Sequence, residues 1–357
     1  MTTFPPPLDA LNDVPGVVQA LILVSVAHFI LSVRKPLAAQ VSLLCEFIFL
    51  RPPKISVSLT LAESTDDGVK GDPLSNPQVH IASEPNKVQC WDPSTLQHLG
   101  TAPAMTKAEV EILCVKAKEA QKSWSKTTYT QRRMVLRTIQ QYILDHQEDI
   151  CRICARDSGK PKVDALLGEV MTTCEKIRCI NMNGEEWLQK SYRPVGPMMI
   201  HKTAYVEYVP FGVLGVIAPW NYPFHNMLNH VISGLFSGNA VVSKVSEYTT
   251  WSAAYFTRII KAALEAHGHD PDVVQTLTGL GECGAALVQS PHVDKIIFTG
   301  SPGVGRKVMS GCAPNLKPCI LELGGKDPMV ICDDVKIDDV VPWAMRGCFQ
   351  NCGQNCW

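Results

Sequence analysis

Residues 211–244, FGVLGVIAPWNYPFHNMLNHVISGLFSGNAVVSK, decide the fold. An uncharged run at 213–218 predicts a buried strand, and residues 239–243 predict a second one. The stretch 224–236 between them predicts a helix. A strand, a helix and a strand in this order are typical of a unit whose two strands lie parallel in one sheet.

The same alternation continues toward the C-terminus. Further strands are predicted at 273–277, 294–298 and 318–322, and further helices at 250–267, 282–289 and 302–312. Repeated units of this kind predict an α/β fold, a doubly wound parallel sheet with helices on both faces. Because such sheets bind ligands at the carboxyl ends of their strands, functional residues are expected in the loops that follow those strands.

The preceding part of the chain is predicted to be mostly helical after two short strands within residues 87–100. Thr106 and Glu109 form the pattern of a capping box at a helix start. A later helix is expected to stop at Gly159, and the next one to start at Pro161. An extended hairpin is predicted within residues 191–210.

The composition of the chain argues against some classes of partner and of site. A net charge of -1 and the lack of a basic stripe argue against a nucleic-acid partner. The 14 cysteines are scattered through predicted helices and strands, so we predict free thiols in a reducing compartment. We predict no metal site.

The pattern of the N-terminal sequence predicts that residues 1–54 form a separate segment. Residues 14–33 carry no charge, and Arg34 and Lys35 follow them. This pattern predicts a membrane anchor, in the endoplasmic reticulum, with the folded domain facing the cytosol. The alternatives are an apolar leader without a membrane role and a cytoplasmic location. Residues 55–87, rich in Pro, Ser, Asp and Gly, predict a linker.

Two candidate sites follow the first two strands. Asn221 stands between prolines after the first strand, where a rigid side-chain amide could donate to a developing oxyanion; the alternative is a turn that starts the next helix. Lys244 and Glu247 end the second strand. An acid there can bond the ribose of a dinucleotide and repel a 2′-phosphate, which favours NAD; the alternative is a solvated lysine and a capping acid.

Two more candidates follow the later strands. Gly300, Ser301 and Gly305 lie where a helix starts, and free N–H groups at such a start can bind an anion. Glu322 ends a strand before a Gly-Gly turn. It is a candidate general base, and the alternative is an acid that bonds the turn amides.

Cys356 is a candidate nucleophile in the run Gly-Gln-Asn-Cys, which suits a tight turn that exposes the sulfur. The six residues CGQNCW at 352–357 are similar to the papain-type protease signature, but they have one residue too many. No histidine partner follows them in the sequence.

Five motifs in one order resemble the aldehyde dehydrogenase superfamily, over residues 88–356. They are PWNYP (219–223), KVSE (244–247), FTGSPGVG (298–305), ELGGK (322–326) and GQNC (353–356). The resemblance is greatest to the membrane-associated aldehyde dehydrogenases of fungi and plants.

The resemblance implies a role for each candidate. Cys356 would attack the aldehyde carbon, the Asn221 amide would help to hold the oxyanion, and Glu322 would activate the hydrolytic water. The cofactor would be NAD, and the substrate an aldehyde oxidised to an acid. The residues implied in cofactor binding are Trp220, Lys244, Glu247, Gly300, Ser301 and Gly305.

Members of that family continue well past the nucleophile, so the resemblance implies a chain truncated just after Cys356. It implies a Rossmann-like NAD-binding domain at 88–190 and 211–322, an oligomerisation hairpin at 191–210, and the beginning of the catalytic domain at 323–357. A homo-oligomer is expected for the family; whether the truncated chain assembles or is active stays open. The rival hypothesis is a non-catalytic, membrane-anchored nucleotide-binding or interaction protein.

Overall fold

The computed structural model describes residues 37–64 and 72–355. It divides the chain into two units, residues 1–51 and 52–357. The described part of the first unit is one helix, α2 (Leu37–Phe49), of 13 residues.

The prediction of a membrane anchor is corrected by the structure. Within residues 37–64 and 72–355, no helix combines the length and the apolar character that a membrane crossing needs. Residues 14–33, on which the prediction depended, lie outside the described residues.

The second unit is built on a parallel sheet of five strands, in the order β7-β6-β5-β8-β9. This confirms the predicted doubly wound sheet. The central strands are buried on both faces, which explains why apolar residues make up most of their sequences. The strands are β5 (Val213–Ile217), β6 (Ala240–Lys244), β7 (Val274–Leu277), β8 (Lys295–Gly300) and β9 (Cys319–Leu323).

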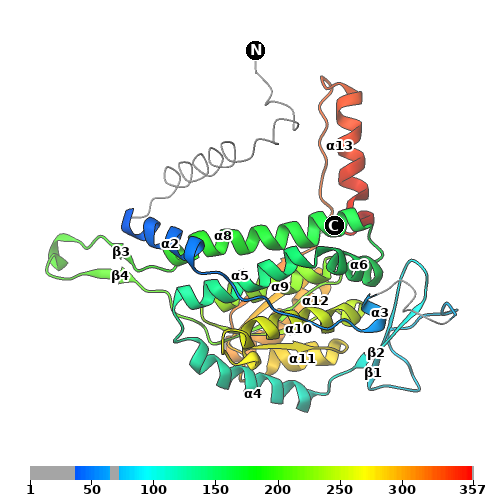
Figure 1. Ribbon diagram of the computed structural model, residues 1–357, viewed down its shortest axis with the longest axis horizontal. Coiled ribbons are helices and arrows are strands. Elements are labelled where there is room, and N and C mark those ends of the chain that lie inside the picture. Colours follow the sequence, from blue (N-terminus) through cyan, green and yellow to red (C-terminus); the bar gives the residue numbers. More distant parts are fainter. Residues whose placement is uncertain (1–36, 65–71, 356–357) are drawn as a thin grey trace. The chain divides into compact units, whose positions relative to one another are not determined.

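Helices cover both faces of the sheet (Figure 1). One face carries α9 (Pro223–Phe236) and α10 (Thr250–Glu265), with α5 (Tyr129–Asp145) and α8 (Thr172–Trp187) packed outside them. The other face carries α4 (Lys107–Trp124), α11 (Gly281–Gln289) and α12 (Pro302–Cys312). The core between the layers includes the Phe224 and Phe256 rings, edge to face with centroids 4.8 Å apart.

The helix boundaries follow local sequence signals. Thr106 and Glu109 form the predicted capping box at the start of α4. A second capping box, between Thr128 and Gln131, starts α5. Gly159 ends α6 (Gln147–Ser158) with a φ of 75°, a left-handed conformation that favours glycine.

Two antiparallel hairpins flank the sheet domain. The first pairs β1 (Lys87–Trp91) with β2 (His98–Pro103). The second pairs β3 (Ser191–Arg193) with β4 (Ala204–Val206), within the stretch where a hairpin is predicted.

The first part of the predicted linker packs against the rest of the second unit, to which it belongs. Ile55, Val57 and Leu59 pack against the core. The short helix α3 (Leu61–Ser64) buries Glu63, whose carboxylate lies 2.6 Å from the Arg258 guanidinium.

The remaining elements frame the carboxyl edge of the sheet and the C-terminal end. After α6, the chain forms the short helix α7 (Lys162–Ala165) and a π-helical turn, η3 (Leu166–Met171). The last helix, α13 (Ile337–Phe349), leads into a 3₁₀ turn, η8 (Gln350–Gly353). The strand order reverses direction between β5 and β8, and ligands bind at such points in doubly wound sheets.

Candidate active site

The loop after β5 is bonded to the last described residues of the chain. The Asn221 side-chain amide donates to the Gln354 carbonyl oxygen at 2.7 Å, and its oxygen accepts from the Asn226 amide at 3.1 Å. The next residue, Tyr222, donates its hydroxyl to the Asn355 side-chain oxygen at 2.5 Å. Helix α9 has no side-chain cap at its N-terminus, and the Asn221 side chain joins the C-terminal turn through its amide and α9 through its oxygen.

The turn itself has an unusual backbone. Asn351, Cys352 and Gly353 have φ angles of 56°, 56° and 71° in succession. Non-glycine residues in this region cost about 1 kcal/mol or more each, so other contacts must hold the turn. Asn351 supplies them: its N–H donates to the Asp164 carboxylate at 2.8 Å, and its side-chain amide donates to the Asn221 carbonyl at 3.1 Å. Its side chain is fully buried.

A buried ion pair supports the contact between the Asn221 loop and the C-terminal turn, which is called the Asn221 junction below. The Lys160 ammonium is 2.6 Å from the Glu169 carboxylate, and both side chains are 0% exposed. The same ammonium donates to the Asn221 carbonyl at 2.7 Å and lies 4.2 Å from the centre of the Tyr222 ring. The Asn221 loop is therefore held by two sets of contacts, one with the buried Lys160 and one with the C-terminal turn.

Glu169 also connects the buried ion pair to the first turn of α9. Its second carboxylate oxygen accepts from the His225 backbone N–H at 2.8 Å, in the first turn of that helix. A carboxylate is favoured there by the helix dipole. Burial raises the pKa of Glu169, and the Lys160 ammonium opposes that shift. A buried carboxylate with these two partners is a fixed structural element rather than a mobile base.

The ends of β6 and β8 carry the candidate cofactor residues. Lys244 is almost fully buried, and its ammonium lies 2.9 Å from the Glu247 carboxylate. The exposed Trp220 ring, at the end of β5, lies 6.4 Å from the Tyr248 ring beside them. The structure thus brings Trp220, Lys244 and Glu247 to one edge of the sheet.

The start of α12 has the form of an anion site. Ser301 caps the helix by accepting from the Val304 N–H at 3.4 Å, and a side chain at Gly303 would meet no atom within 4 Å. At Gly305, a Cβ would lie 2.7 Å from the Leu323 side chain, so glycine allows α12 to approach β9. Gly300 ends β8, directly before the cap. The α12 start offers N–H donors for an anion, and Lys244 and Glu247 offer a cation and an acceptor at the carboxyl end of another strand of the same sheet, a combination that fits a dinucleotide.

Glu322 and Cys356 are placed differently. Glu322 is exposed in β9, in register with Thr299, and within the described residues it forms no hydrogen bond or ion pair with the Asn221 junction. Cys356 lies outside the described residues, immediately after Asn355. In the described part of the chain, no group of three or more His, Cys, Asp or Glu side chains could hold a metal ion.

Most other thiols are poor nucleophiles. Every described cysteine is a free thiol. Burial raises the pKa of Cys90 to about 12, and the pKa values of Cys283 and Cys312 to about 11. Since the thiolate is the reactive form, these cysteines are inert near neutral pH. Cys352 is exposed, and its sulfur lies 3.6 Å from the Gly159 carbonyl oxygen.

Sequence reasoning missed the residues that support the site: Lys160, Glu169, Asp164, Tyr222 and Asn351. Lys160 carries one usable signal, because it stands between a helix-ending glycine and a helix-starting proline and so has little freedom of position. Glu169 has none, since a single acid in a predicted helix is usually solvated.

The model of the aldehyde dehydrogenase family matches residues 80–357. The chain belongs to the aldehyde dehydrogenase family. It is 38% identical over 312 residues to an aldehyde dehydrogenase-like protein of Saccharomyces cerevisiae, which covers 85% of this chain and 48% of the yeast protein. The resemblance of the five motifs is thereby confirmed.

Solved structures of other proteins share the fold, and one of them is an aldehyde dehydrogenase. An NADP-dependent enzyme of E. coli superposes with a TM-score of 0.70 and 29% identity, over 76% of this chain and 55% of that one. An aldehyde dehydrogenase of Mycobacterium tuberculosis complexed with NAD+ superposes equally well, with 26% identity over the same shares. The chain thus spans about half the length of the relatives it matches.

Proposed function

We propose that the chain takes part in NAD-dependent oxidation of an aldehyde to a carboxylic acid, with Cys356 as the nucleophile. The observation that carries this proposal is the hydrogen bond from the Asn221 amide to the Gln354 carbonyl. It brings a rigid side-chain donor to the turn that directly precedes Cys356. A nucleophile beside a preorganised donor is what an addition to a carbonyl needs.

The first step is the addition of the thiolate. The Cys356 sulfur forms a bond to the aldehyde carbon, and the carbonyl electron pair becomes an oxyanion. The Asn221 amide donates a hydrogen bond to this oxygen. Lys160 and Asn351 both donate hydrogen bonds to the backbone carbonyl oxygen of Asn221, and these bonds keep the side-chain amide in place. Because the donor is held before the reaction, little reorganisation is needed as charge develops.

The oxidation and release complete the cycle. When bound, a nicotinamide would supply the acceptor for the hydride. As the C–H bond of the adduct breaks, the oxyanion would re-form the carbonyl, which leaves a thioester on the Cys356 sulfur. Glu322 then accepts a proton from water, whose oxygen attacks the thioester and releases the acid and the thiolate. Glu322 is exposed in this structure, which suits a base that must reach water.

NAD is preferred over NADP in this proposal. Lys244 and Glu247 would hold the adenosine ribose at the end of β6, and the α12 start at Ser301 would hold the pyrophosphate, close to Gly300 and Gly305. The Glu247 carboxylate would repel a 2′-phosphate. Trp220 would line the same side of the site.

The test is NADH formation by the purified chain with a panel of aldehydes, in parallel with NADP as the cofactor. The proposal expects turnover with NAD, little with NADP, and a larger share of NADP use in the Glu247→Gln variant. Tight NAD binding without turnover in any aldehyde would instead support a non-catalytic nucleotide-binding role. Failure to bind either cofactor would contradict both functions.

A further inference from the structure

The side chain of Asp157, near the end of α6, is a buried acid that the proposed chemistry does not use. The residue is 3% exposed. One of its carboxylate oxygens accepts from the Ser252 backbone N–H at 2.9 Å, and the other is buried without a hydrogen-bond partner in the described part of the chain. An unpartnered oxygen on a buried acid is costly, so a compensating role is expected for this residue.

Asp157 caps α10 from a distant part of the sequence. Ser252 is the third residue of α10, and the N-cap residue Thr249 makes no side-chain hydrogen bond to the helix start. A carboxylate at the first turn of a helix satisfies a free N–H and is favoured by the helix dipole. Asp157 therefore supplies the cap that the residue at the helix start does not provide.

The start of α10 also holds the 3₁₀ turn η5 (Glu247–Thr249), which is called the Glu247 turn below. The buried Thr250 hydroxyl donates to the carbonyl oxygens of Ser246 and Glu247, at 3.0 Å and 3.3 Å. The Glu247 carboxylate in turn lies 2.9 Å from the Lys244 ammonium. Hydrogen bonds and one helical turn thus connect Asp157 to the two residues proposed to hold the adenosine ribose.

The surroundings of Asp157 decide where its charge changes. Burial raises its pKa to about 7, hydrogen bonds from the start of α10 oppose that shift, and the Asp92 carboxylate after β1 adds to it. The Cys90 and Cys154 thiols stay protonated near pH 7, because burial raises their pKa values. Glu247, on the turn packed against α6, is already in an ion pair. Asp157 therefore ionises near neutral pH, beside a turn whose own carboxylate is paired.

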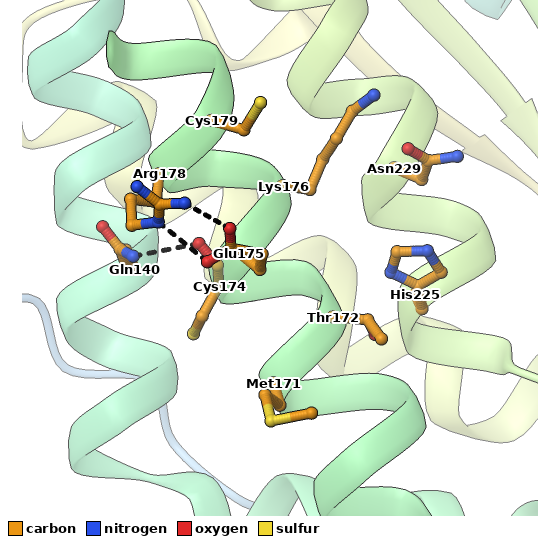
Figure 2. Close-up of a pocket in the computed structure, with 10 residues that line it drawn as sticks. All are labelled: Gln140, Met171, Thr172, Cys174, Glu175, Lys176, Arg178, Cys179, His225 and Asn229. Atoms are coloured by element: carbon orange, nitrogen blue, oxygen red, sulfur yellow. Dashed lines mark hydrogen bonds and ion pairs between the residues drawn. The ribbon is translucent and has the colours of Figure 1, made fainter. Parts of the chain in front are cut away.

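A histidine close to the Asn221 loop does not supply a charge change at this pH. His225 lines a cavity of about 780 Å³, and Figure 2 shows it there among residues of α5, α8 and α9. Burial, with a smaller contribution from the Lys176 ammonium, lowers the pKa of His225 and lowers that of His230 to about 4. Both rings are therefore neutral at pH 7 and above.

We infer that Asp157 is a positioning residue of the cofactor site: its ionised carboxylate fixes the start of α10, and with it the Glu247 turn, in the form that binds the adenosine ribose. The inference rests on the proposed function. A charged acceptor forms a stronger hydrogen bond than a neutral one, so the turn is held more firmly when Asp157 is ionised. By reciprocity, a ligand that binds the firmly held turn favours the ionised form of Asp157.

The experiment measures NAD binding to the full chain by calorimetry, from about pH 6 to about pH 8 at constant ionic strength. Asp157→Asn keeps the shape and an acceptor oxygen and removes the charge. Thr250→Val keeps the shape and removes the hydroxyl that joins the cap to the Glu247 turn. Asp270→Asn is the matched control, because Asp270 caps a different turn, η6 (Pro271–Val273), beyond the other end of α10.

The wild-type Kd for NAD should fall at least about threefold over this range as Asp157 ionises. In Asp157→Asn, the Kd should stay at the value that the wild type has at the low end of the range. The control Asp270→Asn should follow the wild type. Thr250→Val should bind NAD more weakly and lose most of the pH dependence, so its combination with Asp157→Asn should add little.

Two results would overturn the inference even if NADH formation were normal: a wild-type Kd that does not change with pH, or the same pH dependence in Asp157→Asn. NAD binding with the expected pH dependence, but without NADH formation from any aldehyde, would count against the proposed function alone. Absence of NAD binding at every pH would contradict both.

Discussion

The Asn221 side-chain amide donates a 2.7 Å hydrogen bond to the Gln354 carbonyl, although the two residues are 133 positions apart. This bond ties the loop after the central strand β5 to the turn that precedes Cys356. The turn holds three successive left-handed residues, so its shape depends on partners outside itself. Asn221 is therefore a structural partner of the turn as well as the proposed oxyanion donor.

Replacement of Asn221 tests both roles. In Asn221→Ala, we expect NADH formation to fall about 10²- to 10³-fold, because one oxyanion donor is lost. The free energy of unfolding should fall by only about 1 kcal/mol, the usual net contribution of one hydrogen bond. Asn183→Ala is the control, since that amide bonds only its own helix. Comparable rates in the two variants would exclude Asn221 from the chemistry.

The buried pair of Lys160 and Glu169 should be costly to break. In Lys160→Met, a buried carboxylate loses its counter-ion, so we expect a loss of about 3–5 kcal/mol in the free energy of unfolding. Urea denaturation measures it. The double variant Lys160→Met/Glu169→Leu should lose less than the single variant, because no buried charge remains.

The exposed pair of Lys122 and Glu119 is the control, and Lys122→Met should lose at most about 1 kcal/mol. If Lys160→Met were as mild as this control, the ion pair would not be what supports the Asn221 loop.

Replacement of Gly168 tests its close packing against the Tyr222 ring. A Cβ at this position would overlap the Tyr222 ring, and that ring cannot retreat freely because the Lys160 ammonium lies 4.2 Å from its centre. We expect Gly168→Ala to destabilise the fold by about 1–3 kcal/mol and to weaken the hydroxyl bond to Asn355. Gly281→Ala, where a Cβ meets nothing within 4 Å, should be close to neutral in thermal unfolding. The same melting temperature for both variants would argue against this contact.

Asp157 should make stability depend on pH. Burial raises its pKa from 3.8 to about 7, so between these pH values the folded state binds a proton that the unfolded state has released. Stability from this group is therefore present below about pH 4 and falls as the pH rises to about 7, by about 4 kcal/mol at most. His230 acts in the opposite direction over an overlapping range, because its folded pKa is lowered to about 4.

The comparison of wild type with Asp157→Asn isolates the carboxyl group. We expect the variant to gain stability relative to the wild type between pH 4 and pH 7 and to keep a constant difference above that range. Unfolding curves at several pH values would show it. A difference that did not change with pH would mean that Asp157 is ionised throughout.

The sequence predicts the sheet better than the site. Each strand from β5 to β9 contains a short, mainly apolar stretch, and this local pattern is enough to locate it. Thr106 and Gly159 likewise mark helix ends through their own chemistry. The order of the motifs then identifies the family.

The support of the site depends on contacts that no local pattern contains. Lys160 and Glu169 look like solvated charges until the fold buries them together, and Asn351 gains its partners only when the C-terminal turn meets Asp164. The prediction of a membrane anchor was wrong. It rested on the composition of one stretch of sequence, and within the described residues no helix is long and apolar enough to cross a membrane.

The central claim is that Cys356 attacks the aldehyde beside Asn221. The most direct measurement is peptide mass spectrometry of the Glu322→Gln variant after incubation with NAD and an aldehyde. Without the base that activates water, the thioester should accumulate, and the account predicts an acyl adduct on Cys356 that is absent without NAD. An adduct on Cys352 instead, or no adduct on any cysteine while NAD is bound, would contradict it.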